Sequence, residues 1–173
     1  RCFVGPVALS LALLAGCGGS GDSGGGTPPR SVVLITVDTL RADRIGCYGY
    51  EKAVTPNIDA LAQNGVLFDR AFATVPITMP SHTSILTATI PPYHGVRNNG
   101  SYTASRGLVT MAEVLKEQGY HTGAFIAAHV LDSQYGLDQG FDIYSNVKQT
   151  QVGMGLWMSE RPAEDVNLSL IHI

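Results

Sequence analysis

The sequence predicts an α/β fold, with a mostly parallel sheet and helices on both of its faces. Segments rich in apolar and β-branched residues alternate with segments of helical periodicity from residue 31 to about 145. With 173 residues and 45% hydrophobic content, the chain can bury one ordinary core. The alternation weakens after Asp142 and no closing element follows, so we expect the fold to be incomplete at the C-terminus.

The first predicted strand is the apolar, β-branched run Val32–Val37, which is typical of a strand covered on both faces. A helix is expected next, over Thr55–Ala62. Thr55 would be its N-cap, a proline stands at the first helical position, and Gly65 follows its end. A second strand is expected within Val66–Thr74, where apolar residues recur.

Further elements follow the same alternation. Pro80–Thr87 is expected to be a helix. Thr110–Gln118 predicts an amphipathic helix with Met111, Val114 and Leu115 on one face, ended by a glycine. Thr122–Val130 then predicts another strand.

Residues 1–17 have the pattern of an export signal. A positive charge precedes a short apolar run, which ends in Leu-Ala-Gly-Cys at Cys17. This ending resembles the bacterial lipobox, after which the signal is cut and Cys17 is lipidated. A plain secretory signal is the alternative. Residues 18–30, rich in glycine, serine and proline, predict a flexible tether.

These segments together predict an exported protein, lipid-anchored to a membrane of the bacterial cell envelope, in the periplasm, at the outer membrane or at the cell surface. Residues 31–167 would be the N-terminal part of its catalytic domain. Residues 168–173 resemble the translation of a sequencing adapter and are expected to be non-native. A natural apolar tail is the alternative.

Charge and cysteine content exclude two classes of protein. The net charge is −3 and no basic cluster stands out, so we expect no nucleic-acid partner. Cys2 and Cys17 belong to the leader and Cys47 stands alone, which leaves no disulfide framework in a mature protein.

The chemistry-bearing stretch is Thr78-Met79-Pro80-Ser81-His82. It places a hydroxyl at the start of a predicted helix, where the backbone favours anions. Asp38 ends the first predicted strand, at the sheet edge where open α/β folds bind ligands. A carboxylate and a hydroxyl in these places suit a metal-assisted ester hydrolase. Ser81 is the rival hydroxyl, and for Thr78 a helix-capping role can coexist with a nucleophilic one.

Several ordered motifs resemble the sulfatase family of the alkaline phosphatase superfamily. They are V-D-T-L-R-A-D, G-C-Y-G-Y, T-P-N-I-D-A-L-A, P-S-H-T-S-I-L-T, H-G-V-R-N-N-G and G-L-D-Q-G-F-D, spread from Val37 to Asp142. The resemblance implies an alkaline-phosphatase-like sheet. It also implies that Asp38 is the first metal-binding carboxylate.

Two positions depart from the sulfatase pattern. Thr39 stands where sulfatases carry a second aspartate that helps to hold calcium. Thr78 stands where they carry the cysteine or serine that is oxidised to formylglycine, and His82 replaces an arginine. Thr-x-Pro-x-His instead resembles the phosphodiesterase and nucleotide pyrophosphatase branch, in which a metal-bound threonine attacks phosphorus.

The same resemblance gives Asn99 a role, since that branch places a phosphoryl-binding asparagine after an H-G-x segment. An Asn-Asn-Gly turn is the alternative, and Asn98 is the second choice. His82 is expected to orient the helix start or pack beside the site, and His94 to fix its turn by hydrogen bonding. Arg41 is expected to pair with Asp43, with substrate contact as the alternative.

The resemblance therefore implies an enzyme that hydrolyses phosphate esters or, as the less favoured choice, sulfate esters of small molecules or glycans. Attack by Thr78 would give a covalent threonine intermediate. Two divalent cations are implied, zinc rather than calcium, with their remaining ligands outside these residues, so the fragment itself is expected to be inactive. The alternatives are a non-catalytic lipoprotein that binds anions or carbohydrate, and a phosphoethanolamine-type transferase.

Overall fold

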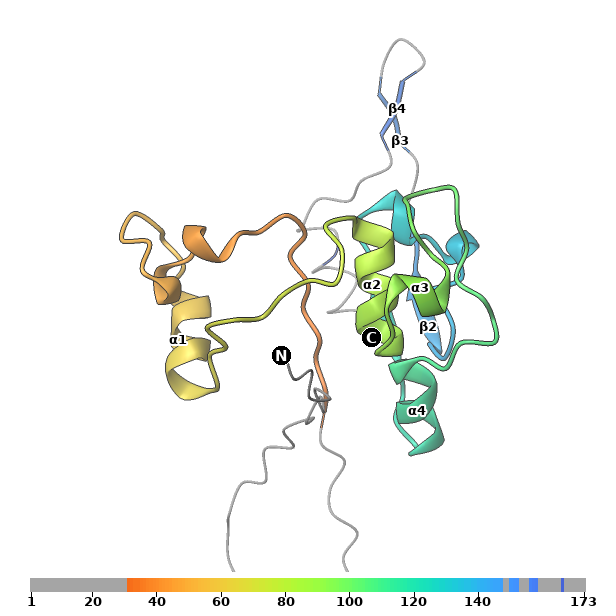
Figure 1. Ribbon diagram of the computed structural model, residues 1–173, viewed down its shortest axis with the longest axis horizontal. Helices are drawn as coiled ribbons and strands as arrows, with labels where there is room; N and C mark the ends of the chain where they lie inside the picture. The colour runs from red at the N-terminus through yellow and green to blue at the C-terminus, as the bar shows by residue number, and fades with distance from the viewer. Residues whose placement is uncertain (1–30, 148–149, 153–155, 159–165, 167–173) are drawn as a thin grey trace, which may run out of the picture. The chain divides into compact units, whose positions relative to one another are not determined.

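The computed structural model describes residues 31–147, 150–152, 156–158 and 166 (Figure 1). Its helices and strands all lie in the compact unit Leu34–Ile173. In chain order they are η1 (Ala42–Arg44), η2 (Gly46–Tyr48), α1 (Pro56–Asn64), α2 (Thr78–Thr87), α3 (Pro91–His94), α4 (Met111–Glu117), β1 (Gly123–Phe125), η3 (His129–Leu131), η4 (Ser133–Tyr135), β2 (Ile143–Ser145), β3 (Thr150–Val152) and β4 (Leu156–Met158). Within the described residues, no helix combines the length and apolar character needed to cross a membrane.

Helix α1 confirms the first predicted helix, with Pro56 at its first position and Gly65 after its end. Thr55 occupies the predicted N-cap position, but its side chain makes no capping hydrogen bond. Its hydroxyl lies 3.1 Å from Asp59 Oδ2 and accepts the Gly46 N–H at 3.1 Å. Thr55 therefore ties α1 to η2 rather than satisfying the first amides of its own helix.

Helix α4 is fixed by a capping box. The Glu113 N–H donates to Thr110 Oγ1 at 3.1 Å, and the Thr110 N–H donates to Glu113 Oε2 at 2.8 Å. The predicted apolar face is only partly right. Val114 is exposed, whereas Ala112 is the residue that is buried.

A parallel pair of strands confirms the predicted sheet type. Strand β1 pairs with β2, with Gly123 opposite Ile143 and Phe125 opposite Ser145. Thr122 and Asp142 lock the start of this pair, since the Thr122 N–H donates to Asp142 Oδ2 at 3.0 Å. The other two strands, β3 and β4, form an antiparallel pair.

Two predicted strands are absent from the described structure. Residues 32–37 and 66–74 have no strand assignment, and most of their large apolar side chains are exposed: Val32, Val33, Leu34, Ile35, Val37, Val66, Leu67, Phe68 and Phe72. An extended segment becomes a strand only when neighbouring backbone pairs with its N–H and C=O groups. The described residues do not supply that partner, so apolar composition alone does not produce a strand here.

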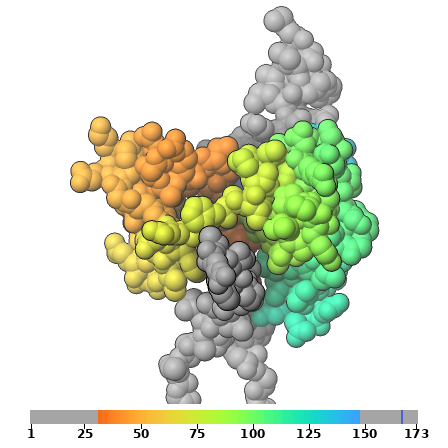
Figure 2. All heavy atoms as spheres, viewed as in Figure 1, coloured from red at the N-terminus to blue at the C-terminus, as the bar shows by residue number. Residues whose placement is uncertain are grey.

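The core gathers around helix α2, which packs against α3, α4 and η3. In Figure 2, the atoms coloured from yellow-green to cyan, which include α2 and the described residues that follow it, pack into one continuous body. Met79, in the first turn of α2, is fully buried and belongs to a cluster with Val96, Ala104, Ile126, Leu131, Leu137 and Val147. Burying such a side chain contributes about 1.5–3 kcal/mol. The start of α2 is therefore held by the core.

Candidate active site

Helix α2 begins at Thr78, the predicted nucleophile. Ile77, in extended conformation, occupies the N-cap position, so Thr78 is the first helical residue and not the cap. Pro80 fits this first turn because its missing N–H would have no partner within the helix. The Thr78 side chain is half-buried, between the buried Met79 and solvent.

Asp38 and Thr78 meet as the sequence predicted, although 40 residues separate them. The Thr78 hydroxyl donates to Asp38 Oδ2 at 3.0 Å. The other carboxylate oxygen, Oδ1, accepts the Thr39 N–H at 3.0 Å. Thr39 has a φ of 57°, which is unusual for a β-branched residue. This left-handed turn places the amide of Thr39 on the Asp38 carboxylate.

Asn99 reaches the same helix terminus. Its Oδ1 accepts the Met79 N–H at 2.9 Å, which satisfies one of the free amides of the first turn. Since Oδ1 is engaged, the two N–H groups of Nδ2 are the donors that Asn99 can offer to an anion. The local turn is made by its neighbour, because Asn98 Oδ1 accepts the Asn99 N–H at 2.8 Å.

His82 holds the segment before Asp38 against α2. Its Nδ1 lies 2.8 Å from the Thr78 carbonyl oxygen, which can only accept, so Nδ1 carries the proton. Nε2 then accepts from the Thr36 hydroxyl at 3.1 Å. The predicted orienting role of His82 therefore matches its contacts. The sequence does not mark Thr36 as the partner of His82, because 46 residues separate the two.

The two remaining predicted residues are Arg41, which has a local partner, and Ser81, which lies three residues after Thr78 in α2. Arg41 pairs with Asp43 through Nη2 and Oδ2 at 2.6 Å, and both side chains are exposed. This contact lowers the pKa of Asp43 and raises that of Arg41. Ser81 is half-buried, and its N–H donates to the Ile77 carbonyl at 3.0 Å. Of the two alternatives for Arg41, the structure thus shows the ion pair with Asp43.

The Asp38 and Thr78 oxygens are suitable donors for a divalent cation, since hard cations prefer oxygen ligands. They lie 3.0 Å apart, so one ion could contact both. Among the described residues, no group of three or more His, Cys, Asp or Glu side chains could hold a metal ion. The described part of the chain therefore offers two oxygen atoms that one cation could contact, and no full coordination shell.

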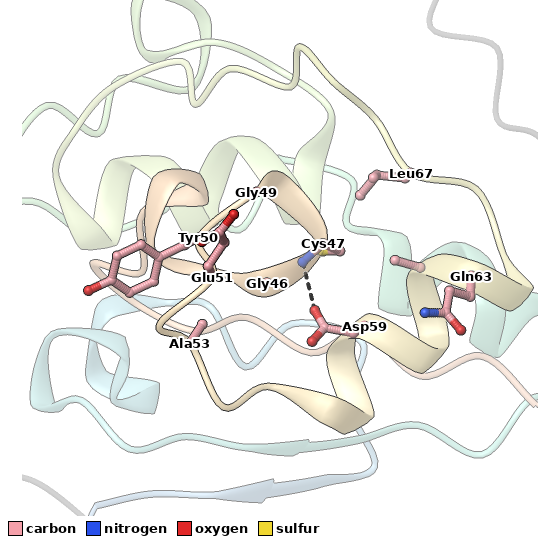
Figure 3. Close-up of a pocket in the computed structure, with 10 residues that line it drawn as sticks. Gly46, Cys47, Gly49, Tyr50, Glu51, Ala53, Asp59, Gln63 and Leu67 are labelled. Atoms are coloured by element: carbon pink, nitrogen blue, oxygen red, sulfur yellow. Dashed lines mark hydrogen bonds between the residues drawn. The ribbon is translucent and has the colours of Figure 1, made fainter.

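An open pocket of about 490 Å³ lies elsewhere, over η2 and α1 (Figure 3). Its lining includes Cys47, Tyr50, Glu51, Asp59 and Gln63, but none of the predicted site residues. The Asp59 carboxylate is already used, because Oδ1 accepts the Cys47 N–H at 2.7 Å. We place the candidate site at α2, where the Thr78 hydroxyl meets the solvent-exposed carboxylate of Asp38.

Sequence reasoning missed one group of contacts behind the site. Ser84, in the second half of α2, accepts a hydrogen bond from Thr74 at 2.9 Å and lies 3.0 Å from the His94 ring. The turn-fixing role predicted for His94 is confirmed, because its Nδ1 accepts the Val96 N–H at 3.1 Å. No local pattern in the sequence marks Ser84 as a partner of His94, or Thr74 as a partner of Ser84.

Comparison with known proteins gives a consistent result. The family model described as Sulfatase matches residues 30–156. An N-acetylgalactosamine-6-O-sulfatase of Bacteroides thetaiotaomicron is 36% identical over an alignment of 124 residues, and the match covers 68% of this chain and 24% of that protein. Human arylsulfatase A is 37% identical over 123 residues, covering 68% of this chain and 23% of its own length. Mouse steryl-sulfatase is 32% identical over 164 residues, and the match covers 84% of this chain and 26% of the steryl-sulfatase.

Solved structures give the same picture. The phosphonate monoester hydrolase of Agrobacterium radiobacter aligns with a TM-score of 0.57 and 26% identity, over 65% of this chain and 25% of that one. A 2-O GAG sulfatase aligns with a TM-score of 0.54 and 26% identity, over 67% of this chain and 25% of the sulfatase chain. The chain thus spans about a quarter of the length of these proteins.

Proposed function

We propose, since this chain belongs to the sulfatase family, that the full-length protein containing it is a metal-dependent hydrolase that uses Thr78 as its nucleophile. The observation that carries the proposal is the 3.0 Å hydrogen bond from the Thr78 hydroxyl to Asp38 at the first turn of α2. An unperturbed threonine hydroxyl is a weak nucleophile and needs a neighbouring base or cation. In the proposal, Asp38 acts as that base or helps to bind that cation.

The residues present define the first chemical step. The Thr78 oxygen would bond to the phosphorus of a bound ester, its proton would leave toward Asp38 or solvent, and the bond to the leaving alcohol would break. Asn99 would donate from Nδ2 to a nonbridging oxygen, because its Oδ1 is held by the Met79 N–H. Water would then cleave the ester formed on Thr78 and restore the hydroxyl.

Asp38 and Thr78 would each contribute one oxygen ligand to a divalent cation. We expect zinc at two sites rather than calcium, because Thr39 stands where sulfatases carry a second calcium-binding aspartate. When bound, such cations favour the ionised form of the hydroxyl and neutralise charge on the substrate. The proposal places their other ligands outside the described residues, where no three-ligand group is found.

Phosphate esters are the favoured substrates, with sulfate esters second. Thr78 cannot give the aldehyde that formylglycine chemistry requires, because oxidation of a secondary alcohol yields a ketone. The likeness to a phosphonate monoester hydrolase supports an enzyme acting at phosphorus. The sulfatase relatives, one of them named for a galactosamine sulfate, keep sulfated glycans as the second class.

The proposal also includes export and lipid anchoring at Cys17. It rests on the leader pattern at residues 1–17, which lies outside the described residues, as do the tether at 18–30 and the tail at 168–173. A protein held at the membrane by Cys17 would meet its substrates in the cell envelope.

A kinetic comparison tests the proposal. Turnover of an aryl phosphodiester, an aryl phosphomonoester and an aryl sulfate would be measured for the full-length protein with zinc, manganese or calcium. We expect zinc-dependent phosphodiester cleavage that falls on the order of a thousandfold or more in Thr78→Ala. Ser81→Ala, one turn further along α2, is the matched control and should retain turnover.

Two results would contradict the proposal. Full activity in Thr78→Ala would show that Thr78 is not the nucleophile. Loss of activity in Ser81→Ala alone would show that Ser81 is the nucleophile instead. Absence of turnover with every metal and ester would instead favour a non-catalytic binding protein.

A further inference from the structure

His94 stands at the centre of a chain of hydrogen bonds that joins α3 to α2. It is the last residue of α3 and only 5% exposed. The Val96 N–H donates to its Nδ1 at 3.1 Å, so Nδ1 has no proton in this arrangement. Nε2 therefore carries the proton and donates to Ser84 Oγ at 3.0 Å. Burial lowers the pKa of His94, which favours this neutral form.

The same serine receives a second hydrogen bond. The Thr74 hydroxyl donates to Ser84 Oγ at 2.9 Å, from the segment that leads into α2. Ser84 is itself buried, at 7% exposure. A buried polar group without a partner costs about 1–3 kcal/mol, so this network strongly favours one orientation of the imidazole ring.

The segment from His94 to Asn99 is thereby fastened to α2 at two places. His94 contacts Ser84 in the body of the helix, and Asn99 contacts the Met79 N–H in its first turn. The two helix positions are roughly 7.5 Å apart along the axis, at 1.5 Å per residue. Between the two attachments, the fully buried Val96 anchors the segment in the core.

The Val96 N–H is the link between the imidazole and the rest of the segment. It is a buried backbone donor, and the structure satisfies it with the His94 ring. If that acceptor were removed, Val96 would have to turn toward another acceptor or remain unpaired. Either change would be passed along the short connection to Asn99, only three residues further on.

We propose that His94 is a positioning residue for Asn99. By accepting the Val96 N–H and donating to Ser84, it fixes the segment that aims the Asn99 amide at the substrate anion. The inference rests on the proposed function, because Asn99 matters to turnover only if the site at Thr78 is catalytic. His94 itself touches none of the reacting atoms.

Two substitutions separate the two hydrogen bonds of the ring. His94→Asn keeps an acceptor near the Nδ1 position for the Val96 N–H. His94→Gln extends toward Ser84 and loses that acceptor. Each would be measured in the full-length protein with zinc and bis(4-nitrophenyl) phosphate, alone and combined with Asn99→Ala. His121→Gln, at an exposed histidine, is the control, and thermal unfolding confirms that each variant is folded.

We expect His94→Gln to lower kcat about tenfold with little change in KM, because the lost hydrogen bond orients a group that acts in the transition state. His94→Asn should recover most of that loss. In the Asn99→Ala background, His94→Gln should cause no further loss, since residues that act through one another are not additive.

Equal losses from His94→Gln with and without Asn99 would overturn the inference, as would an unchanged kcat in the folded His94→Gln variant. Thr78→Ala separates this inference from the proposed function. If Thr78→Ala retains turnover while the double-mutant cycle couples His94 to Asn99, the nucleophile is wrong and the positioning role stands. A wild-type protein without turnover would overturn both.

Discussion

Asn99 makes one structural contact through its amide, and we propose a chemical contact for the other amide atom. Oδ1 accepts the Met79 N–H, which leaves the Nδ2 donors for the proposed contact with an anion. The Asn-Asn-Gly sequence suggested a turn or a binding residue as alternatives; the structure shows a turn contact at Asn98, and the binding role of Asn99 stays a proposal. Asn98 makes the turn, which frees Asn99 to reach the helix.

One substitution can separate the two contacts of Asn99. Asn99→Asp keeps an oxygen for the Met79 N–H but replaces the Nδ2 donors by a negative charge facing an anionic substrate. We expect phosphodiester turnover to fall on the order of a hundredfold or more while the thermal unfolding midpoint stays close to that of the wild type. A large loss of stability with turnover reduced only in proportion would contradict this division of roles.

Among single residues, the sequence predicted those whose roles follow from order along the chain. Asp38 and Thr78 were predicted from their positions after an expected strand and at an expected helix start, and they are in contact even though residues 32–37 form no strand. Thr36, Thr74 and Ser84 could not be predicted as partners. Their contacts depend on how distant segments fold together, and a hydroxyl is common enough that its presence predicts no partner.

At the level of elements, the helices followed the sequence and the strands did so only in part. A helix satisfies its hydrogen bonds locally, so α1, α2 and α4 form within about two residues of their predicted bounds, with α2 beginning at Thr78 rather than at Pro80. A strand depends on a neighbour. The short pair β1 and β2 has one, whereas residues 32–37 and 66–74 do not, and their apolar side chains are exposed.

The start of the parallel pair should be sensitive to acid. Hydrogen bonding to Lys116 and to the Thr122 N–H lowers the pKa of Asp142 to about 2 from its usual 3.8. Because the folded-state pKa is depressed, this carboxylate stabilises the fold above its ordinary pKa, and the contribution is lost as pH falls through about 2.

We therefore expect the difference in thermal midpoint between wild type and Asp142→Asn to be largest above about pH 4 and to shrink toward pH 2. The comparison would be made over that range at constant ionic strength. The ion pair with Lys116 is partly exposed, so the effect should also weaken with added salt. A constant difference across this pH range would show that ionisation of Asp142 contributes nothing.

At the scale of the whole molecule, the chain belongs to a family whose members are about four times as long as the region matched. The described residues contribute the helix that begins at Thr78, the Asp38 carboxylate and the Asn99 amide, which are the parts of the site that we propose. The family's motifs allowed this set to be proposed. The further metal ligands that the proposal requires and the walls of a substrate pocket could not be predicted, because they are not among these motifs.

The proposed export and lipid anchoring also concern the whole molecule. Two cysteines, one as the test and one as its control, allow the anchoring to be measured. Cys17→Ala should move the expressed protein out of the membrane fraction and abolish incorporation of a radiolabelled fatty acid, because it removes the acceptor thiol of the lipobox. Cys47→Ala, at a half-buried cysteine within η2, should change neither readout. Continued lipid labelling of Cys17→Ala would contradict the anchoring proposal.

The most direct test of the account is to identify the residue that becomes covalently modified during turnover. The full-length zinc-loaded protein would be mixed with an aryl phosphodiester, quenched in acid within the first turnover, and its peptides sequenced by mass spectrometry. The account predicts a phosphoryl ester on Thr78, absent in Thr78→Ala and retained in Ser81→Ala. Modification of Ser81, or turnover with no modified residue, would contradict it.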